Sequence, residues 1–185
     1  GEGIDGSGNV VTEKRNLDAS FTKIDASSGV EVIVEQGAPT EVEVEVDDNL
    51  LEHIITKVEN GTLIVKIEGN INTMESAIVR VRTNTINGLE ASSGASIRSK
   101  SNLRGTNIAI KTSSGSTIQA ELEYEKVSCE STSGSEIKVS GKALALDTKS
   151  SSGSEIEAQD LAANEIVAQS TSGSSTTLNP IVLLN

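Results

Sequence analysis

A phrase that returns five times ends in a serine followed by a glycine, and the hydroxyls of these five serines are the first groups in this chain that could act as nucleophiles. They are Ser93, Ser114, Ser133, Ser152 and Ser172. A serine nucleophile needs a neighbouring base that takes its proton, yet no histidine or lysine recurs at a fixed distance from these serines. We therefore expect their hydroxyls to bond to one another or to backbone groups, and we predict no catalytic residue among them.

The single histidine and the single cysteine are the next candidates for proton transfer, metal binding or redox chemistry. One cysteine, Cys129, cannot form an internal disulfide and offers no metal cluster. Its place between Val127 and a glycine corner favours a core position. His53 lies in a short apolar segment, which favours an exposed or structural histidine over a catalytic base. We expect no cofactor and no metal bound by these two residues.

Carboxylates could hold a cation in two places. Glu41, Glu43 and Glu45 alternate with valines, but their spacing matches neither an EF-hand loop nor the calcium-binding nonapeptide repeat. Glu136 and Glu155 are predicted to lie on neighbouring strands. They would form a strained pair, a pair bridged by a cation, or two side chains that splay apart, and we favour the last. No metal site is predicted.

We call Glu41, Glu43 and Glu45 the acidic comb. A modest basic band follows it in the sequence. In this band only Glu90 opposes the cations, which are Arg80, Arg82, Arg98, Lys100, Arg104 and Lys111. We favour a solvated face with ion pairs between neighbouring strands over an anion-binding site. The ligand-binding residues therefore remain unknown at this level.

Composition limits the partners. The 185 residues carry a net charge of −12, whereas nucleic acid and anionic membrane surfaces both require a basic footprint, so we expect neither. No apolar run approaches the ~20 residues that a membrane-spanning helix needs. The only aromatic residues are Phe21 and Tyr124.

The elements that must position these residues follow from a repeated phrase. It reads Ala91-Ser-Ser-Gly94, Thr112-Ser-Ser-Gly115, Ser131-Thr-Ser-Gly134, Ser150-Ser-Ser-Gly153 and Ser170-Thr-Ser-Gly173, with glycines 21, 19, 19 and 20 residues apart. A period near twenty is typical of a solenoid whose coils stack on their neighbours. Apolar residues spaced by two on either side of each corner predict strands, with Ile97, Ile118, Ile137 and Ile156 facing inward. An outward column with alternating charge, Glu90, Lys111, Glu130 and Lys149, also predicts stacking in register.

The predicted fold class is accordingly an all-β, single-chain parallel β-helix. Residues 1–16 are expected to be a flexible lead and 17–185 a single β-helix domain: 17–90 irregular capping coils, 91–178 regular repeats, and 179–185 the C-terminal end. A separate small β domain is the alternative for the irregular half. In that half, Asp47-Asp48-Asn49 predicts the start of a short helical turn carrying Leu50, Leu51, Ile54 and Ile55, and Asn60-Gly61 predicts a hairpin turn.

Several phrases together resemble a known family. They are Gly6-Ser-Gly-Asn-Val-Val-Thr-Glu13, Phe21-Thr-Lys-Ile-Asp25, Gly29-Val-Glu-Val, Glu35-Gln-Gly37, Val46-Asp-Asp-Asn-Leu-Leu51, Asn60-Gly-Thr-Leu63 and Gly69-Asn-Ile-Asn72. Their order and the Ser-Gly corners resemble the putative auto-transporter adhesin, head GIN domain family of Bacteroidetes-type bacteria, over nearly the whole chain. The resemblance implies a right-handed β-helix, a location outside the cytoplasm and no catalytic residues.

The function expected from these observations is that of a non-enzymatic surface or secreted module, an adhesin or a cell-envelope interaction protein. Its expected partner is a host or envelope glycan or protein. A polysaccharide-active or polysaccharide-binding β-helix and a structural spacer are the alternatives. The chain starts at Gly1 rather than at methionine, which favours a removed leader and export. The expected location is extracellular, periplasmic, or at the outer membrane through a lipid anchor on the removed segment.

Overall fold

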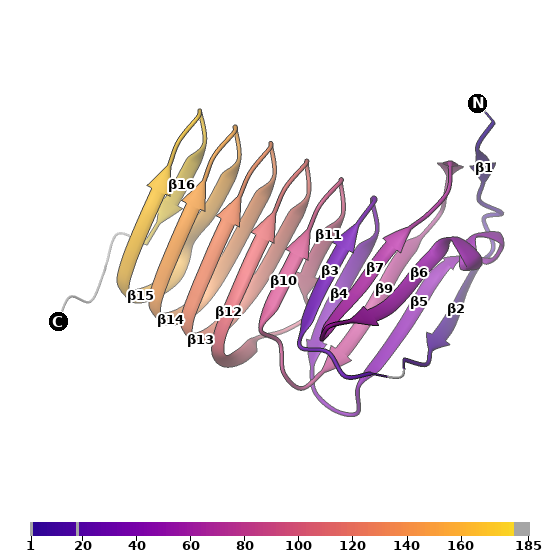
Figure 1. Ribbon diagram of the computed structural model, residues 1–185, viewed down its shortest axis with the longest axis horizontal. Coiled ribbons are helices and arrows are strands. Elements are labelled where there is room, and N and C mark those ends of the chain that lie inside the picture. Colours follow the sequence, from indigo (N-terminus) through magenta and orange to yellow (C-terminus); the bar gives the residue numbers. More distant parts are fainter. Residues whose placement is uncertain (1, 18, 180–185) are drawn as a thin grey trace.

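The computed structural model describes residues 2–17 and 19–179, and these residues form strands almost throughout (Figure 1). The first nine strands are β1 (Ile4–Asp5), β2 (Val10–Arg15), β3 (Lys23–Ser27), β4 (Glu31–Gln36), β5 (Glu41–Asp47), β6 (Ile54–Glu59), β7 (Thr62–Ile67), β8 (Ile71–Thr73) and β9 (Ala77–Thr83). A 3-10 helix, η1 (Asp48–His53), joins β5 to β6. The later strands are β10 (Gly88–Ala91), β11 (Ser96–Ser99), β12 (Leu103–Thr112), β13 (Thr117–Ser131), β14 (Glu136–Ser150), β15 (Glu155–Ser170) and β16 (Ser175–Leu178). The expected C-terminal end, 179–185, lies outside the described residues except for Asn179.

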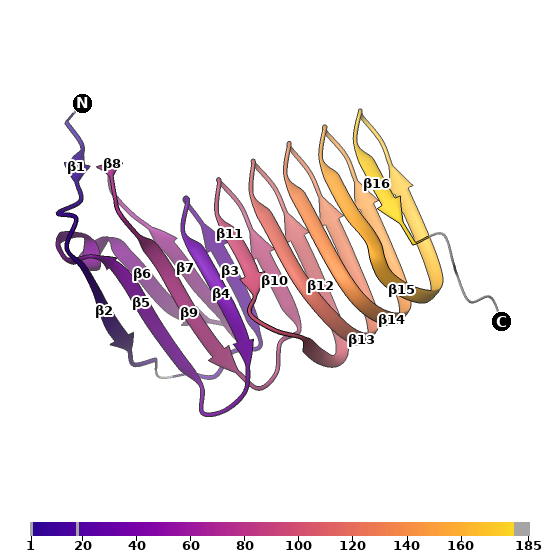
Figure 2. The same ribbon diagram turned by 180° about the vertical axis from the view of Figure 1, so that it is seen from behind.

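One mixed sheet of fourteen strands organises the described residues, and β1 pairs with β8 apart from it. Eleven of its strands follow a continuous path in the order β2-β5-β9-β4-β11-β13-β12-β10-β3-β7-β6. The path doubles back at β13, because the first residues of β13 pair with β11 and its later residues pair with β12. Figures 1 and 2 show the strands side by side along the long axis, with β15 and β16 at the end opposite β1 and β2.

The two ends of this path come together at Arg15. Its guanidinium lies on β2 and donates from Nη1 to the Ile54 carbonyl of β6 at 2.8 Å and from Nη2 to the Leu51 carbonyl at 3.0 Å. These bonds satisfy carbonyl groups near the β6 edge of the sheet. The eleven strands therefore form a nearly closed, barrel-like mixed sheet.

The predicted right-handed parallel β-helix over 17–185 is wrong. Strands β2 and β5, β5 and β9, and β6 and β7 pair antiparallel, and these pairs join the parallel strands in the same sheet. The alternation of valines with charged residues in Glu41–Asp47 suits a parallel and an antiparallel neighbour equally well. The spacing of the glycines constrains only neighbours in the later half of the chain, so it could not reveal this mixed arrangement.

The register expected between neighbouring strands is nevertheless confirmed in that later half. Ile97, Ile118, Ile137 and Ile156 pair in succession and are at most 1 % exposed. A second column runs beside it: Leu103 pairs with Leu122, which pairs with Gly141, which pairs with Leu161. Gly141 thus takes the place that leucines take on the neighbouring strands. Ala143 is buried two residues later, and Leu144 is 56 % exposed.

The first half of the chain shows both a confirmed turn and two differences. Asn60 and Gly61 have φ of 49° and 75° and join the antiparallel strands β6 and β7, as predicted. The expected helical turn is the short η1, and Ile54 and Ile55 begin β6 instead of continuing it. Residues 1–16, expected as a flexible lead, contain β1 and β2, and β2 pairs with β5 over six residues.

Candidate functional site

The serines before the glycines shape the corners. Ser93, Ser114, Ser133, Ser152 and Ser172 all have φ between 50° and 55°. Each glycine that follows also has positive φ, a conformation that a residue without Cβ adopts at little cost. A corner of the same kind, at Ser28 and Gly29, joins β3 to β4 and was not recognised in the sequence.

The hydroxyl that forms the corner hydrogen bonds belongs to the residue after the glycine. Ser116 Oγ donates to the Ala91 carbonyl at 2.7 Å and accepts from the Ser113 amide at 3.1 Å. The amides of Thr132, Ser151 and Thr171 donate in the same way to Ser135, Ser154 and Ser174. At these four corners the expected hydrogen bonds are therefore formed by the serine after the glycine and not by the serine before it, whereas Ala95 follows Gly94 at the first corner. These hydroxyls have a structural role.

Cys129 and His53 both have structural surroundings. Cys129 is buried, and burial, followed by the nearby charge of Asp147, raises the pKa of its thiol to about 12. The thiol is thus protonated at neutral pH and a poor nucleophile. His53 Nδ1 lies 2.8 Å from the Glu68 carbonyl, beside Gly69, and its ring fixes the segment after β7.

The acidic comb and the basic band face each other on adjacent strands. Strands β5 and β9 pair so that Glu41 lies opposite Arg82 and Glu43 lies opposite Arg80. Arg82 Nη2 is 3.0 Å from Glu41 Oε2, and Arg80 Nη1 is 3.2 Å from Glu45 Oε1. These ion pairs involve Glu41 and Glu45, which are carboxylates that a calcium site in the acidic comb would need. They also show that Glu90 is not the only acidic partner of the band.

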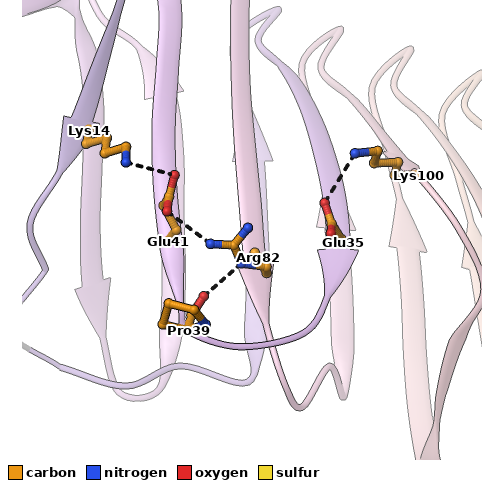
Figure 3. A network of polar contacts seen from close by, with 6 residues as sticks. All are labelled: Lys14, Glu35, Pro39, Glu41, Arg82 and Lys100. Atoms are coloured by element: carbon orange, nitrogen blue, oxygen red, sulfur yellow. Dashed lines mark hydrogen bonds and ion pairs between the residues drawn. The ribbon is translucent and has the colours of Figure 1, made fainter.

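The same ion-pair network extends across neighbouring strands (Figure 3). Lys14 Nζ lies 3.6 Å from Glu41, Lys100 Nζ lies 3.4 Å from Glu35, and Arg82 Nε donates to the Pro39 carbonyl at 2.9 Å. We call the outward side chains of β5, β9, β4 and β11, together with Lys100 directly after β11, the charged face. It surrounds a groove of about 330 Å³ whose lining includes Ile33. Cations on this face are therefore largely neutralised.

The column of alternating charge has the predicted register. Glu90, Lys111, Glu130 and Lys149 pair in succession across β10, β12, β13 and β14. None of the ion pairs within residues 2–17 and 19–179 joins two members of this column. Glu90 also pairs in register with Asp25 of β3, and burial followed by the charge of Glu90 raises the pKa of Asp25.

Three carboxylates lie close together on β14 and β15, near the end of the molecule opposite β1 and β2. Oxygens of Glu136, Glu155 and Glu157 lie within 4.8 Å of one another, and each side chain is half-buried. The charge of Glu157, then burial, then the charge of Glu136 raise the pKa of Glu155. The two glutamates expected to splay apart are thus brought together, and their mutual repulsion is unfavourable. Carboxylate oxygens are ligands that Ca²⁺ accepts, although it takes six to eight oxygens.

A wide hollow lies where the loop between β9 and β10 meets the outward side of β12 and β13. We call it the polar hollow. It has a volume of about 760 Å³, and its lining is Lys23, Asn84, Thr85, Asn87, Arg104, Gly105, Thr106, Asn107, Ile108, Ala109, Lys126 and Ser128. Its size is in the range of known ligand sites. The lining contains three cations, three amides and three hydroxyls, and no carboxylate.

Two side chains from outside the lining hold the walls of the polar hollow. Gln36 Nε2 donates to the carbonyls of Asn84 and Arg104, at 2.8 Å each, and Gln36 Oε1 accepts from the Arg104 amide at 2.8 Å. Tyr124 Oη donates to the Ile86 carbonyl at 2.7 Å, and burial raises its pKa to about 12. The tyrosine therefore stays a donor at neutral pH, and the loop is fixed on both sides.

Sequence reasoning identified only part of the polar hollow. Arg104 was named in the basic band, but Lys23, Lys126 and Gln36 were not named, because the pairing that brings them together joins residues far apart in the chain. Tyr124 carried a signal that could have been used: a lone tyrosine in a chain nearly without aromatics favours a specific hydrogen bond at a buried position.

Several solved structures share the fold of this chain. A putative adhesin from Bacteroides fragilis superposes with a TM-score of 0.89 at 22% identity, over 95% of this chain and 83% of that chain. A putative adhesin from Parabacteroides merdae superposes with a TM-score of 0.75 at 22% identity, over 94% of this chain and 82% of that chain. A putative lipid binding protein from Parabacteroides distasonis superposes with a TM-score of 0.69 at 15% identity, over 94% of this chain and 98% of that chain. At these identities the likeness establishes the fold.

The family itself is established by the sequence. The family model described as "Putative auto-transporter adhesin, head GIN domain" matches residues 20–184, which confirms the resemblance drawn from the motifs. Proteins with curated functions give no match to this chain. Within the described residues, the helical structure is too short to cross a membrane. The chain belongs to the putative auto-transporter adhesin, head GIN domain family.

Proposed function

We propose that this protein is a non-enzymatic binding module of the adhesin type that works outside the cytoplasm, secreted or at the cell surface. Membership of the adhesin family and the likeness to solved putative adhesins support this proposal. The observation that carries it is the polar hollow, which offers many hydrogen-bonding groups on a strand-built, prearranged surface. Prearrangement reduces the entropy that binding must overcome.

The proposal is tested by binding of the purified chain to a glycan array and by capture of partners from envelope and host-surface fractions. Saturable binding of a defined glycan or protein supports an adhesin-type module. A heat-unfolded sample of the same chain serves as the control for non-specific adsorption. Turnover of a polysaccharide would instead indicate an enzyme, and absence of any saturable binding would favour a structural spacer.

Lipid is a second candidate ligand, favoured by an apolar hollow beside the first. This second hollow has a volume of about 460 Å³, shares Gly105 with the polar hollow, and is lined by Tyr124, Ala143 and the exposed Leu144 among others. One structure with the same fold is described as a putative lipid binding protein. Displacement of a fluorescent fatty acid, lost in Leu144→Glu and kept in Val167→Glu, would support this candidate.

A further inference from the structure

The polar hollow concentrates positive charge in a strongly acidic protein. Lys23, Arg104 and Lys126 line it without a carboxylate in the lining, although the whole chain has a net charge of −12. On the charged face, by contrast, Arg80, Arg82, Arg98 and Lys100 each lie within 3.5 Å of a glutamate oxygen. The polar hollow therefore differs from the charged face, where each of these cations lies beside a carboxylate.

Two of the three cations in the hollow are available to a ligand. Among the described residues, Lys23 and Lys126 take part in none of the ion pairs, whereas Arg104 Nε lies 3.2 Å from Glu123. The stem of Lys23 packs over Gly88, where a Cβ atom would come within 3.0 Å of Lys23 Cγ. The small residue thus leaves room for the lysine stem across β10, beside the hollow.

The other lining groups suit a sugar chain. Three asparagine amides and three hydroxyls offer both donors and acceptors, as sugar hydroxyls require. Ala109 also lines two further hollows, but Asp25 and Glu90 in one and Glu130 and Asp147 in the other would repel an anion, so an anionic ligand is confined to the polar hollow. A nucleic acid would need a much larger basic surface than three cations in an acidic protein provide.

We propose, building on the binding function above, that the polar hollow holds an anionic glycan, with Lys23 and Lys126 contacting its carboxylate or sulfate groups. The asparagines and hydroxyls of the lining bind the sugar hydroxyls. Gln36 and Tyr124 are positioning residues, because they fix the loop between β9 and β10 without lining this hollow.

The test is a calorimetric titration of the full chain with three oligosaccharides at low salt. They are an oligogalacturonate, the same oligomer with its carboxylates methyl-esterified, and a sulfated galactan oligomer, which carries sulfates and no carboxylate. The ester keeps the sugar skeleton and removes the charge, and the sulfated oligomer separates sulfate from carboxylate recognition. The double variant Lys23→Gln/Lys126→Gln is compared with Lys57→Gln/Lys138→Gln, which removes the same charge outside the hollow.

We expect at least one acidic oligomer to bind, and the neutral ester to bind at least about tenfold more weakly than the free acid if galacturonate is the ligand. If sulfate is preferred, only the sulfated galactan oligomer binds. An exposed charge pair contributes up to about fivefold in affinity. The affinity of Lys23→Gln/Lys126→Gln should therefore fall roughly tenfold, and that of the control Lys57→Gln/Lys138→Gln should fall less than about threefold.

Failure to bind either acidic oligomer, equal affinity for galacturonate and its ester when both bind, or equal losses of affinity in the two double variants would overturn the inference. The proposed function has a separate criterion. If the array and the envelope capture still find a saturable neutral or protein partner, the adhesin-type function stands and only the anionic ligand is refuted. If they find none, the proposed function fails as well.

Discussion

Gly141 is the position at which a single methyl group should damage this fold most selectively. It lies in β14 between Leu122 of β13 and Leu161 of β15, with φ of 109°. A Cβ atom there would overlap the Leu122 carbonyl oxygen and come within 2.9 Å of its carbonyl carbon. Both of these are backbone atoms in a sheet, so the contact can be relieved only by separating β13 from β14.

The expected cost of Gly141→Ala follows from these two effects. An L-residue held in an unfavourable positive-φ conformation costs about 1–3 kcal/mol, and each ladder hydrogen bond lost costs about 1 kcal/mol. With one or two such bonds broken, the loss in the free energy of unfolding is about 2–5 kcal/mol. The matched control is Gly153→Ala, a corner glycine with φ of 71° and no atom within 4 Å of the position that a Cβ would take. Only the conformational cost applies there, about 1–2 kcal/mol.

Urea unfolding followed by far-ultraviolet circular dichroism measures both losses. The slope of the free energy against urea should stay the same in both variants, so that the midpoints report stability directly. Gly141→Ala should unfold at a clearly lower urea concentration than Gly153→Ala. Equal midpoints would refute the close approach of β14 to Leu122, and with it the register assigned to this part of the sheet.

Further predictions test the core, a buried carboxylate and the acidic cluster. Ile137→Ala should cost about 2–5 kcal/mol because it opens a cavity between two paired isoleucines, whereas the exposed Lys138→Ala should cost under about 1 kcal/mol; comparable losses in urea unfolding would contradict the inward and outward assignments. For Asp47, burial raises the pKa, but hydrogen bonds from the amides of Gly8, Ser76 and Glu75 outweigh it and lower the pKa overall. Its stabilisation is therefore present above the ordinary carboxyl pKa near 3.9 and lost as the pH falls through the lower folded value. The melting temperature of Asp47→Asn should thus lie several degrees below that of the parent at pH 7 and approach it in acid; a gap independent of pH would disprove this. Glu155 has a raised pKa, so its charged form is unfavourable in the fold; Glu155→Gln should raise the melting temperature by roughly a few degrees at pH 7, with no gain below the ordinary carboxyl pKa, and a lower melting temperature at pH 7 would show that the three carboxylates do not repel one another.

Local features of the fold could be predicted because the same residue types recur on neighbouring strands. One buried column could be predicted from Ile118, Ile137 and Ile156, since adjacent parallel strands place equivalent residues side by side. Asn60-Gly61 identifies a hairpin turn by its backbone requirements alone. The mixed, nearly closed sheet could not be predicted, because alternating patterns do not distinguish parallel from antiparallel neighbours and Arg15 gives no local sign of joining β2 to β6.

The candidate site was mostly hidden for the same reason. The ion pairs of the charged face join residues 35 to 67 positions apart, such as Glu41 and Arg82, so a count of charges along the sequence assigned the wrong partners to the basic band. Lys23 and Lys126 are about a hundred positions apart in the chain and line one hollow only because β3, β10, β12 and β13 are adjacent in the sheet. The sequence alone predicts the corners and the columns of equivalent residues. A surface built from several strands can be predicted only when the order of the strands is known.

Saturation binding of the intact chain to an array carrying matched acidic and neutral glycans tests the central claim most directly. The account predicts a saturable signal on acidic members that weakens roughly tenfold in Lys23→Gln/Lys126→Gln and is retained in Lys57→Gln/Lys138→Gln. A signal that does not saturate, or one that is unchanged when the two lysines of the polar hollow are replaced, would contradict it.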